Sequence, residues 1–471
     1  MSDWIDAEQS VERAHEFYER GRWAEAESHL RRALSVNPYQ AEWHFNLGLT
    51  LEAAGRHREA ADAFIEASEL QPGESAGAVS AGANLIRAGD PAQSLELLDR
   101  AERSGADAAV VAVHRIEAFT DLGRHDEAET AFYIGVEHAE DDAELYATMG
   151  DCLLDQGEHE RALWCLRRAA TLDPDLPEID IRLAAVFERS GRFERARQMY
   201  MRHLRSDPGD VDALLDLAKL LQRMNRAVEA GEKLRRVLEL EPRCGEAHAL
   251  LSDLAEDQAT AISEMDVAVR LDPKVPGGRR RLASLLTDRR GVGDAERVDE
   301  LIAAELTDFD LASSFDTEAA AELVDLCLDA GRPRDAAQLA KRLCEESPDD
   351  LQAAHLLSVA MLEAGDLRTG MEVARKIVRR APRFLPAMYN LALAHMRRGE
   401  WLRARYWVNQ ARQVDCEDGS IRRLRVRLWY RAALGVGAAT LRLAWSGVLL
   451  LTTPARRPRR SPAPNHLPTA R

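Results

Sequence analysis

The feature that most constrains this chain is a repeat of 34 residues. Proline marks the repeat: Pro38 and Pro72 lie 34 positions apart, and Pro174, Pro208 and Pro242 continue the same spacing. Self-similarity at a fixed period of about 20 to 50 residues is typical of an array in which one small structural motif is stacked many times. We number each repeat by slots, with residue 7 as slot 1 of the first repeat.

Each repeat contains two stretches of helical apolar periodicity, separated by glycine at slot 15 and closed by proline near slot 32. RWAEA follows Gly21, RHREA follows Gly55 and RHDEA follows Gly123. Glycine ends a helix in the left-handed conformation, and proline restricts the residue before it against continuing the second helix. Slot 8 is small in ten of twelve repeats, as at Gly48 and Gly150. The pattern predicts helical hairpins that approach closely and must stack on their neighbours to bury an apolar face.

These slots resemble the tetratricopeptide repeat (TPR) family over residues 7–416, in about twelve repeats. The resemblance implies an all-α fold, a right-handed superhelical solenoid whose concave face is lined by the first helix of each hairpin. Repeat eight is three residues short in its turn, and repeats nine and ten start about 41 residues apart. We therefore expect a front block of about nine repeats in residues 1–306 and a rear block of three in residues 317–417.

Charge is distributed unevenly along the 471 residues. The net charge is −17, but the first 418 residues hold 52 basic and 80 acidic side chains, whereas the last 53 hold eleven Arg and no acid. Polyphosphate binding needs dense Lys and Arg, so the acidic body argues against nucleic acid as a partner. The N-terminus shows no basic stretch followed by an apolar one, and we expect a cytoplasmic protein. A peripheral position at the inner face of the membrane is the alternative.

Nothing in the sequence predicts catalysis. The spacing G-x-S-x-G occurs at residues 73–77, but it follows a repeat junction rather than a strand, which favours a helix N-cap for Ser75. His57, His125 and His159 all occupy slot 17, so the repeat itself explains them without a metal. The six cysteines include no C-x-x-C pair, which fits reduced, mostly buried thiols. We expect no enzyme activity, no cofactor, no metal and no small-molecule substrate.

The candidate binding residues are charged side chains at first-helix slots 2, 5, 6, 9, 12 and 13, which the resemblance places on the concave face. They form an acidic set in repeats four and five, a mixed set after it and a second acidic set in repeat ten. The acidic set of repeats four and five is Glu117, Asp121, Glu144, Asp151 and Asp155; the mixed set includes Arg182, Arg189, Lys219 and Arg223; and repeat ten holds Glu318, Glu322, Asp325 and Asp329. They predict a groove for a protein or peptide, basic where the groove is acidic, with the chain's own Arg-rich tail as one candidate. A solvated charged face is the alternative.

Residues 418–453 form a basic and apolar segment. On a helical wheel, Ile421, Leu424 and Leu428 fall in an arc free of Arg, which predicts a helix that caps the last repeat. Residues 432–453 have Arg442 as their one charge, so they are long enough to span a bilayer, but they could also lie on its surface or contact protein. The candidates for contact with a membrane or with the basic tail are Arg422, Arg423, Arg425, Arg427, Trp429 and Trp445. We expect residues 454–471, rich in Pro and Arg, to be disordered.

The sequence therefore predicts a non-enzymatic interaction scaffold that binds a protein segment on the concave face of a TPR superhelix. The alternative is a membrane-associated assembly factor in which the C-terminal basic and apolar helix is the anchor.

Overall fold

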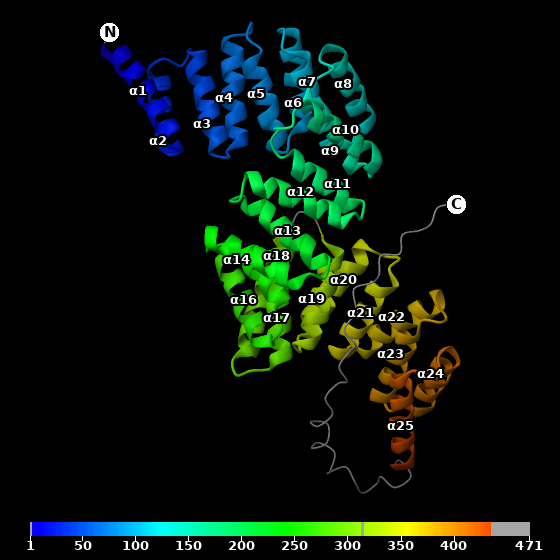
Figure 1. Cartoon of the computed structure of the whole chain (residues 1–471). Coiled ribbons are helices and arrows are strands. Elements are labelled where there is room, and N and C mark those ends of the chain that lie inside the picture. The colour runs from blue at the N-terminus through cyan, green and yellow to red at the C-terminus, as the bar shows by residue number, and fades with distance from the viewer. Residues whose placement is uncertain (1, 312–314, 435–471) are drawn as a thin grey trace. The chain divides into compact units, whose positions relative to one another are not determined.

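A computed structural model describes residues 2–311 and 315–434 of the chain (Figure 1). These residues form 25 helices and no strand. The chain divides into two compact bodies, an N-terminal body (Met1–Leu254) and a C-terminal body (Ala255–Arg471). The predicted all-α fold of stacked helical hairpins is confirmed within each body.

The N-terminal body contains α1 to α15. Their bounds are α1 Ser2–Glu19, α2 Trp23–Val36, α3 Ala41–Ala53, α4 His57–Leu70, α5 Ala76–Arg87, α6 Pro91–Arg103, α7 Ala108–Asp121, α8 His125–His138, α9 Ala143–Asp155, α10 His159–Leu172, α11 Ile179–Arg189, α12 Phe193–Ser206, α13 Val211–Arg223, α14 Ala227–Leu240 and α15 Gly245–Leu254.

The C-terminal body contains α16 to α25. Their bounds are α16 Gln258–Leu271, α17 Gly278–Arg289, α18 Asp294–Leu311, α19 Thr317–Asp329, α20 Pro333–Glu346, α21 Leu351–Glu363, α22 Leu367–Arg380, α23 Leu385–Arg397, α24 Trp401–Val414 and α25 Gly419–Leu434.

In every hairpin except that of repeat eight, the turn between the two helices has left-handed backbone at slot 15. Gly157, for example, has φ +78°. Where the repeat lacks glycine, Asn225 (φ 62°) and Arg290 (φ 54°) adopt the same conformation. The chain therefore keeps the turn geometry even at a residue for which it costs about 1–2 kcal/mol.

In five repeats, the residues after slot 15 form an ion pair that was not predicted from the sequence. The Arg at slot 16 precedes the second helix and bonds to the acid at slot 19, in the first turn of that helix. Arg22 donates to Glu25 (2.6 Å), and Arg226 donates to Glu229 (2.7 Å). The recurring R-x-x-E motif is thus a local i,i+3 pair that places a carboxylate at the positive end of the helix dipole.

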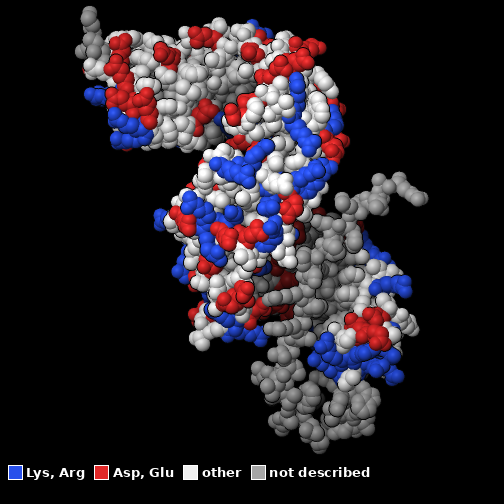
Figure 2. Space-filling view, in the orientation of Figure 1, with Lys and Arg blue, Asp and Glu red and all other residues white. Residues whose placement is uncertain are grey.

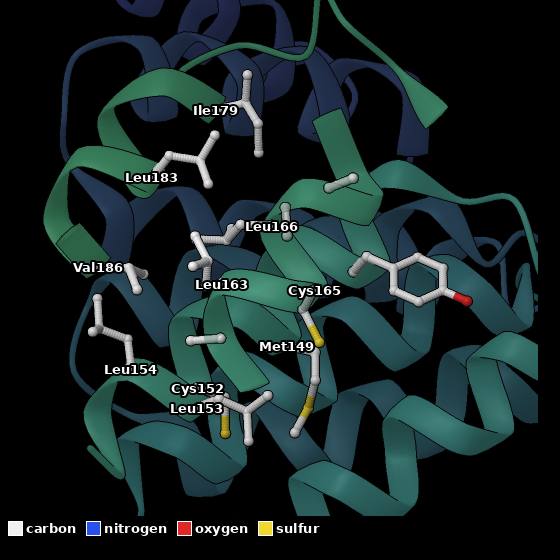
Figure 3. Packing of buried hydrophobic residues seen from close by; sticks show 14 of the residues in the cluster. Met149, Cys152, Leu153, Leu154, Leu163, Cys165, Leu166, Ile179, Leu183 and Val186 are labelled. Carbon is white, nitrogen blue, oxygen red and sulfur yellow. The ribbon is translucent and has the colours of Figure 1, made fainter. Parts of the chain in front are cut away.

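The small residue at slot 8 lets the two helices of a hairpin touch. A Cβ atom added to Gly150 would lie 2.7 Å from Cγ of Leu166, and one added to Gly48 would lie 2.6 Å from Cε1 of Phe64. Leu166 and Phe64 are fully buried. Figure 3 shows Leu166 among the apolar side chains of repeats five and six.

Cysteines contribute to the same core. In Figure 3, Cys152 and Cys165 lie with Met149 and Leu153 in one cluster. All six cysteines are free; Cys152, Cys165 and Cys327 are buried, and burial raises the pKa of the Cys165 thiol to about 11. These buried side chains act as small apolar residues.

Repeats eight and nine depart from the regular pattern. The short turn of repeat eight leaves α15 with ten residues, and the division between the two bodies falls at Leu254 and Ala255, just after it. Most of the extra residues after repeat nine extend α18, which is 18 residues long and ends at Leu311. The block boundaries at residues 306 and 317 stay a prediction.

The predicted cap is confirmed. In α25, Ile421, Leu424 and Leu428 are buried in a cluster with Met388 and Val408 of the last repeat. Asp418 starts the helix, because its Oδ1 accepts from the backbone N–H groups of residues 420 and 421, both at 2.8 Å.

In the described part of the chain, no helix is long and apolar enough to cross a membrane. Residues 435–453, including Trp445, and residues 454–471 lie outside the described residues, so their predicted roles are untested.

Candidate functional site

A pocket of about 260 Å³ opens on the first helices of repeats three to six. Its wall contains α5, α7, α9 and α11, which come from hairpins that follow one another in the N-terminal body. Each of these helices contacts the next one, so residues 34 positions apart line the same surface. The pocket is lined by Ala83, Ile86, Arg87, His114, Glu117, Thr120, Asp121, Thr148, Asp151, Cys152, Asp155 and Arg182.

The structure brings most of the first predicted acidic set together here. Glu117 and Asp121 come from α7, and Asp151 and Asp155 come from α9. Glu144 lies beside them, because it accepts a hydrogen bond of 3.1 Å from Arg182. Figure 1 shows α7 and α9 within the N-terminal body.

The positive charges that face these carboxylates are already engaged. Arg182 on α11 bonds to Glu144, and its Nη1 lies 3.5 Å from Oδ2 of Asp151 without the alignment of a hydrogen bond. Arg189 reaches Oδ1 of Asp155 at 3.6 Å. Five carboxylates therefore face two guanidinium groups, which leaves the surface negative.

The pKa values of two pocket carboxylates reflect this excess of negative charge. The pKa of Asp151 is raised to about 6, first by desolvation in the pocket and then by the negative charges of Glu144, Asp155 and Glu117, while Arg182 opposes the rise. Desolvation also raises the pKa of Asp121, with Glu117 and Asp155 adding to it. Both carboxylates would be stabilised by a further cation.

The other charged groups at the pocket do not remove the excess. Glu117 has a local partner, because Nδ1 of His114 lies 2.8 Å from its Oε2, one turn earlier in α7. Arg87 on α5 pairs with Glu52 of α3 (2.5 Å), which is not part of the pocket wall. Asp121 has no cationic partner among the residues that the structure describes.

The remaining basic residues of the mixed set are neutralised by neighbouring helices. Lys219 donates to Asp216 (3.1 Å) and pairs with Glu246 (2.9 Å). Arg223 pairs with Glu188. These cations form ion pairs between adjacent first helices. A role for them in partner binding stays a prediction.

The second acidic set lies on α19 in the C-terminal body. Glu318 is exposed near the start of the helix, and Glu322 reaches Nε of Arg280 at 3.5 Å. Asp325 and Asp329 follow on the same helix and also have interactions. A partner at this set also stays a prediction.

The arginines of the tail lie on the exposed side of α25. Arg422 pairs with Glu417, whereas Arg423, Arg425 and Arg427 are exposed and have no carboxylate partner among residues 2–311 and 315–434. The backbone at Trp429 belongs to α25.

Several pocket residues that were not predicted occupy the same first-helix slots as the predicted ones. Arg87 is slot 13 of repeat three, and His114 and Thr148 are slot 6 of repeats four and five. Taking every first-helix slot, rather than its charged residues alone, would have found them.

No catalytic group is assembled in the pocket. Sγ of Cys152 lies 4.0 Å from Nδ1 of His125, beyond the range of an activated thiol and imidazole pair. Cys152 is also only 1% exposed. The described residues contain no cluster of three or more potential metal ligands.

Stacked helical hairpins with a charged surface on their first helices define an all-α repeat protein of the kind that binds other proteins. The chain belongs to the tetratricopeptide repeat family. A family model described as tetratricopeptide repeat matches residues 11–75, 81–143, 148–211, 322–383 and 357–415, and a second model of the same description matches residues 189–254. The chain is therefore a TPR protein-interaction scaffold.

Known proteins resemble parts of the chain. Human protein O-mannosyl-transferase TMTC1 is 29% identical over 135 residues, which are 28% of this chain and 14% of that protein. The chain thus matches a small part of that relative.

Several solved structures are similar to this chain at low sequence identity. A thermophilic TPR protein from Thermus thermophilus is 22% identical, with 38% of this chain and 98% of that chain covered and a TM-score of 0.32. Human IFIT1, solved as a dimer with PPP-AAAA, is 17% identical, with 71% and 82% covered and a TM-score of 0.44. Yeast Tom70 is 14% identical, with 91% and 96% covered and a TM-score of 0.37.

Proposed function

We propose that the chain is a non-enzymatic scaffold whose N-terminal body binds a basic segment of a partner protein. The binding surface is the acidic pocket on α7 and α9, which we call the acidic groove and define by Glu117, Asp121, Asp151 and Asp155. The observation that carries the proposal is the excess of carboxylates there, with raised pKa values at Asp121 and Asp151.

The acidic groove differs from the neighbouring first helices in how its charges are paired. At neighbouring positions on α11 and α13, cations are matched by carboxylates of adjacent helices, as Arg223 is by Glu188. In the acidic groove, not every carboxylate has a cation beside it, so the ionised carboxylates repel one another. An arginine or lysine side chain from a partner would supply the missing charge.

The shape of the site fits a side chain better than a small substrate. The pocket is an open hollow that continues along a wall of four helices, and its polar groups include Thr120 and Thr148 beside the carboxylates. A peptide lying across α7 and α9 would place one basic side chain in the pocket and others against Glu117 and Asp155.

The likeness to a mannosyl-transferase does not lead us to propose a transferase activity. It covers 28% of this chain and 14% of that protein. The geometry of the pocket supports binding rather than group transfer.

Binding can be tested with the full-length chain and a fluorescent peptide of residues 454–471, which contains five Arg and no acid. The test variant reverses three groove charges, Glu117→Lys, Asp151→Lys and Asp155→Lys. A matched control reverses three exposed carboxylates on second helices of the same body, Glu66→Lys, Glu69→Lys and Glu137→Lys.

We expect the groove variant to lower the affinity about tenfold or more and the control to change it little, because both carry the same net charge but only one changes the groove. A peptide in which every Arg is replaced by Gln should not bind. Equal losses in the two variants would show that net charge, not the groove, attracts the peptide.

A further inference from the structure

Two large aromatic side chains are exposed on the second helices of repeats four and five. Tyr133 of α8 is 58% exposed, and Trp164 of α10 is 62% exposed. The repeat does not require an aromatic residue at the tryptophan, because the equivalent positions of the adjacent repeats are Thr130 and Gln198. Over α8 and α10, Figure 2 shows uncharged surface with charged side chains of both signs around it.

The two exposed rings are the ends of a row of four aromatic rings. The ring centroid of Phe132 lies 5.6 Å from that of Tyr133 and 5.3 Å from that of Tyr146. The ring of Tyr146 in turn lies 6.1 Å from that of Trp164. The two middle rings are buried. The row therefore holds both exposed rings in fixed positions, so little conformational freedom would be lost when another molecule covers them.

One unmatched charge of each sign borders this row. Glu137 lies one helical turn after the exposed tyrosine in α8, and Arg167 lies one turn after the exposed tryptophan in α10. Both side chains are exposed, and neither has an ion-pair partner among the residues that the structure describes. Their neighbours are matched, as Arg161 is by Glu129 (2.5 Å).

We call Tyr133, Trp164, Glu137 and Arg167 the outer patch, and we propose that it is the contact surface between two copies of the chain. A two-fold contact uses the same surface on both copies, so that surface must complement itself. The outer patch meets this condition, because it combines rigid aromatic rings with one unmatched acid and one unmatched base.

In the dimer, Arg167 of each copy lies against Glu137 of the other, and the exposed rings pack together between these two ion pairs. A partner of one charge sign would instead leave one of the two charges unmatched. The proposal is independent of the acidic groove, which lies on the first helices.

The dimer is expected to be weak. Tryptophan, tyrosine and arginine are the residues that most often dominate the binding energy of an interface. Two exposed rings from each copy form only a small apolar centre, so we expect a dissociation constant of about 1–100 µM.

Sedimentation of the full-length chain at concentrations of about 1–300 µM tests the proposal, because a micromolar dimer forms within that range. Trp164→Ala should weaken dimerisation about thirtyfold or more, as is typical of a tryptophan at the centre of an interface. The matched control is Tyr39→Ala, which removes another exposed ring of the same body and should leave the dimer unchanged.

Exchange of the two charges distinguishes a second copy from any other partner. Glu137→Arg alone and Arg167→Glu alone should each weaken the dimer about tenfold or more, because each brings like charges together at two places in the contact. The double variant should recover most of the lost affinity, since both pairs form again with the charges exchanged. Arg235→Glu, an exposed arginine at the same slot of α14, is the control and should have no effect.

Circular dichroism would verify that the variants remain folded. A parent chain that stays monomeric up to about 300 µM would overturn the proposal. Equal dimerisation of Trp164→Ala and Tyr39→Ala would do the same, and so would a double charge variant that dimerises no better than the single ones. The variant with three reversed groove charges should dimerise like the parent, which separates this proposal from that of the acidic groove.

Discussion

Replacing Asp151 with asparagine is expected to stabilise the protein while it weakens binding at the acidic groove. Desolvation and three neighbouring carboxylates raise the pKa of Asp151 from 3.8 to about 6. A carboxyl group whose pKa is raised on folding binds protons more tightly in the folded state. The ionised carboxylate therefore lowers the free energy of unfolding as the pH rises from about 4 to about 6, and this destabilisation is complete at neutral pH.

The magnitude follows from the size of the shift. About two pKa units would correspond to about 3 kcal/mol for a group shielded from water. The Asp151 side chain is 47% exposed, so solvent screening reduces the gain expected from asparagine to about 1 kcal/mol. Loss of the contact with Arg182 offsets part of it, although Arg182 keeps its hydrogen bond to Glu144.

Thermal unfolding followed by circular dichroism measures the effect. A gain of about 1 kcal/mol in a body of this size corresponds to a rise of about 2–4 °C in Tm at about pH 7.5, and the difference from the parent should vanish toward about pH 4. Glu66→Gln, which removes the same charge from the exposed outer side of α4, is the control and should shift Tm little.

The same substitution should weaken binding of the basic peptide, and the parent protein should bind it less tightly as the pH falls through about 6. The reasoning is refuted if Asp151→Asn lowers Tm at about pH 7.5, or if the pH dependence of stability is unchanged. If Asp151→Asn raises stability but leaves the peptide affinity unchanged, Asp151 destabilises the folded state as described but does not take part in binding.

Three further predictions test the packing. Leu166→Ala should destabilise the N-terminal body by about 2–5 kcal/mol in denaturant unfolding, because Leu166 is fully buried against Gly150, and an unchanged midpoint would contradict that packing. Gly157→Ala should cost about 1–2 kcal/mol because of its φ of +78°. Gly231→Ala should stabilise by about 1 kcal/mol, because Gly231 is buried within α14 but an added Cβ would meet only the Arg235 side chain, at 3.6 Å; effects of the same sign in the two variants would contradict this reasoning. Leu424→Ala should loosen α25 and increase amide exchange there and at Met388, while Val426→Ala, on the exposed side, should not.

The repeat pattern predicts the hairpins well because each slot has a local cause. Glycine at slot 15 ends a helix by its own conformational freedom, and the Ile421, Leu424 and Leu428 stripe is visible within eight residues. The match between Arg182 and Glu144 is different, because the two residues are 38 positions apart and meet only when hairpins stack with a particular offset. The position of a residue in the repeat predicts that it lies on the groove wall. The stacking of the hairpins determines whether its charge has a partner.

That distinction explains why the acidic groove was visible in the sequence only as a cluster of charged residues. Arg182, Lys219 and Arg223 belong to clusters as dense as that of Asp121, yet the folded chain supplies each of them with a carboxylate. Asp121 has no such partner among the described residues, although it lies on a regular repeat. A charge that folding leaves unmatched at a rigid position must be satisfied by water or by another molecule. A basic side chain of a partner would match the fixed position of such a charge, so we expect partners at charges that folding leaves unmatched rather than at dense charge clusters.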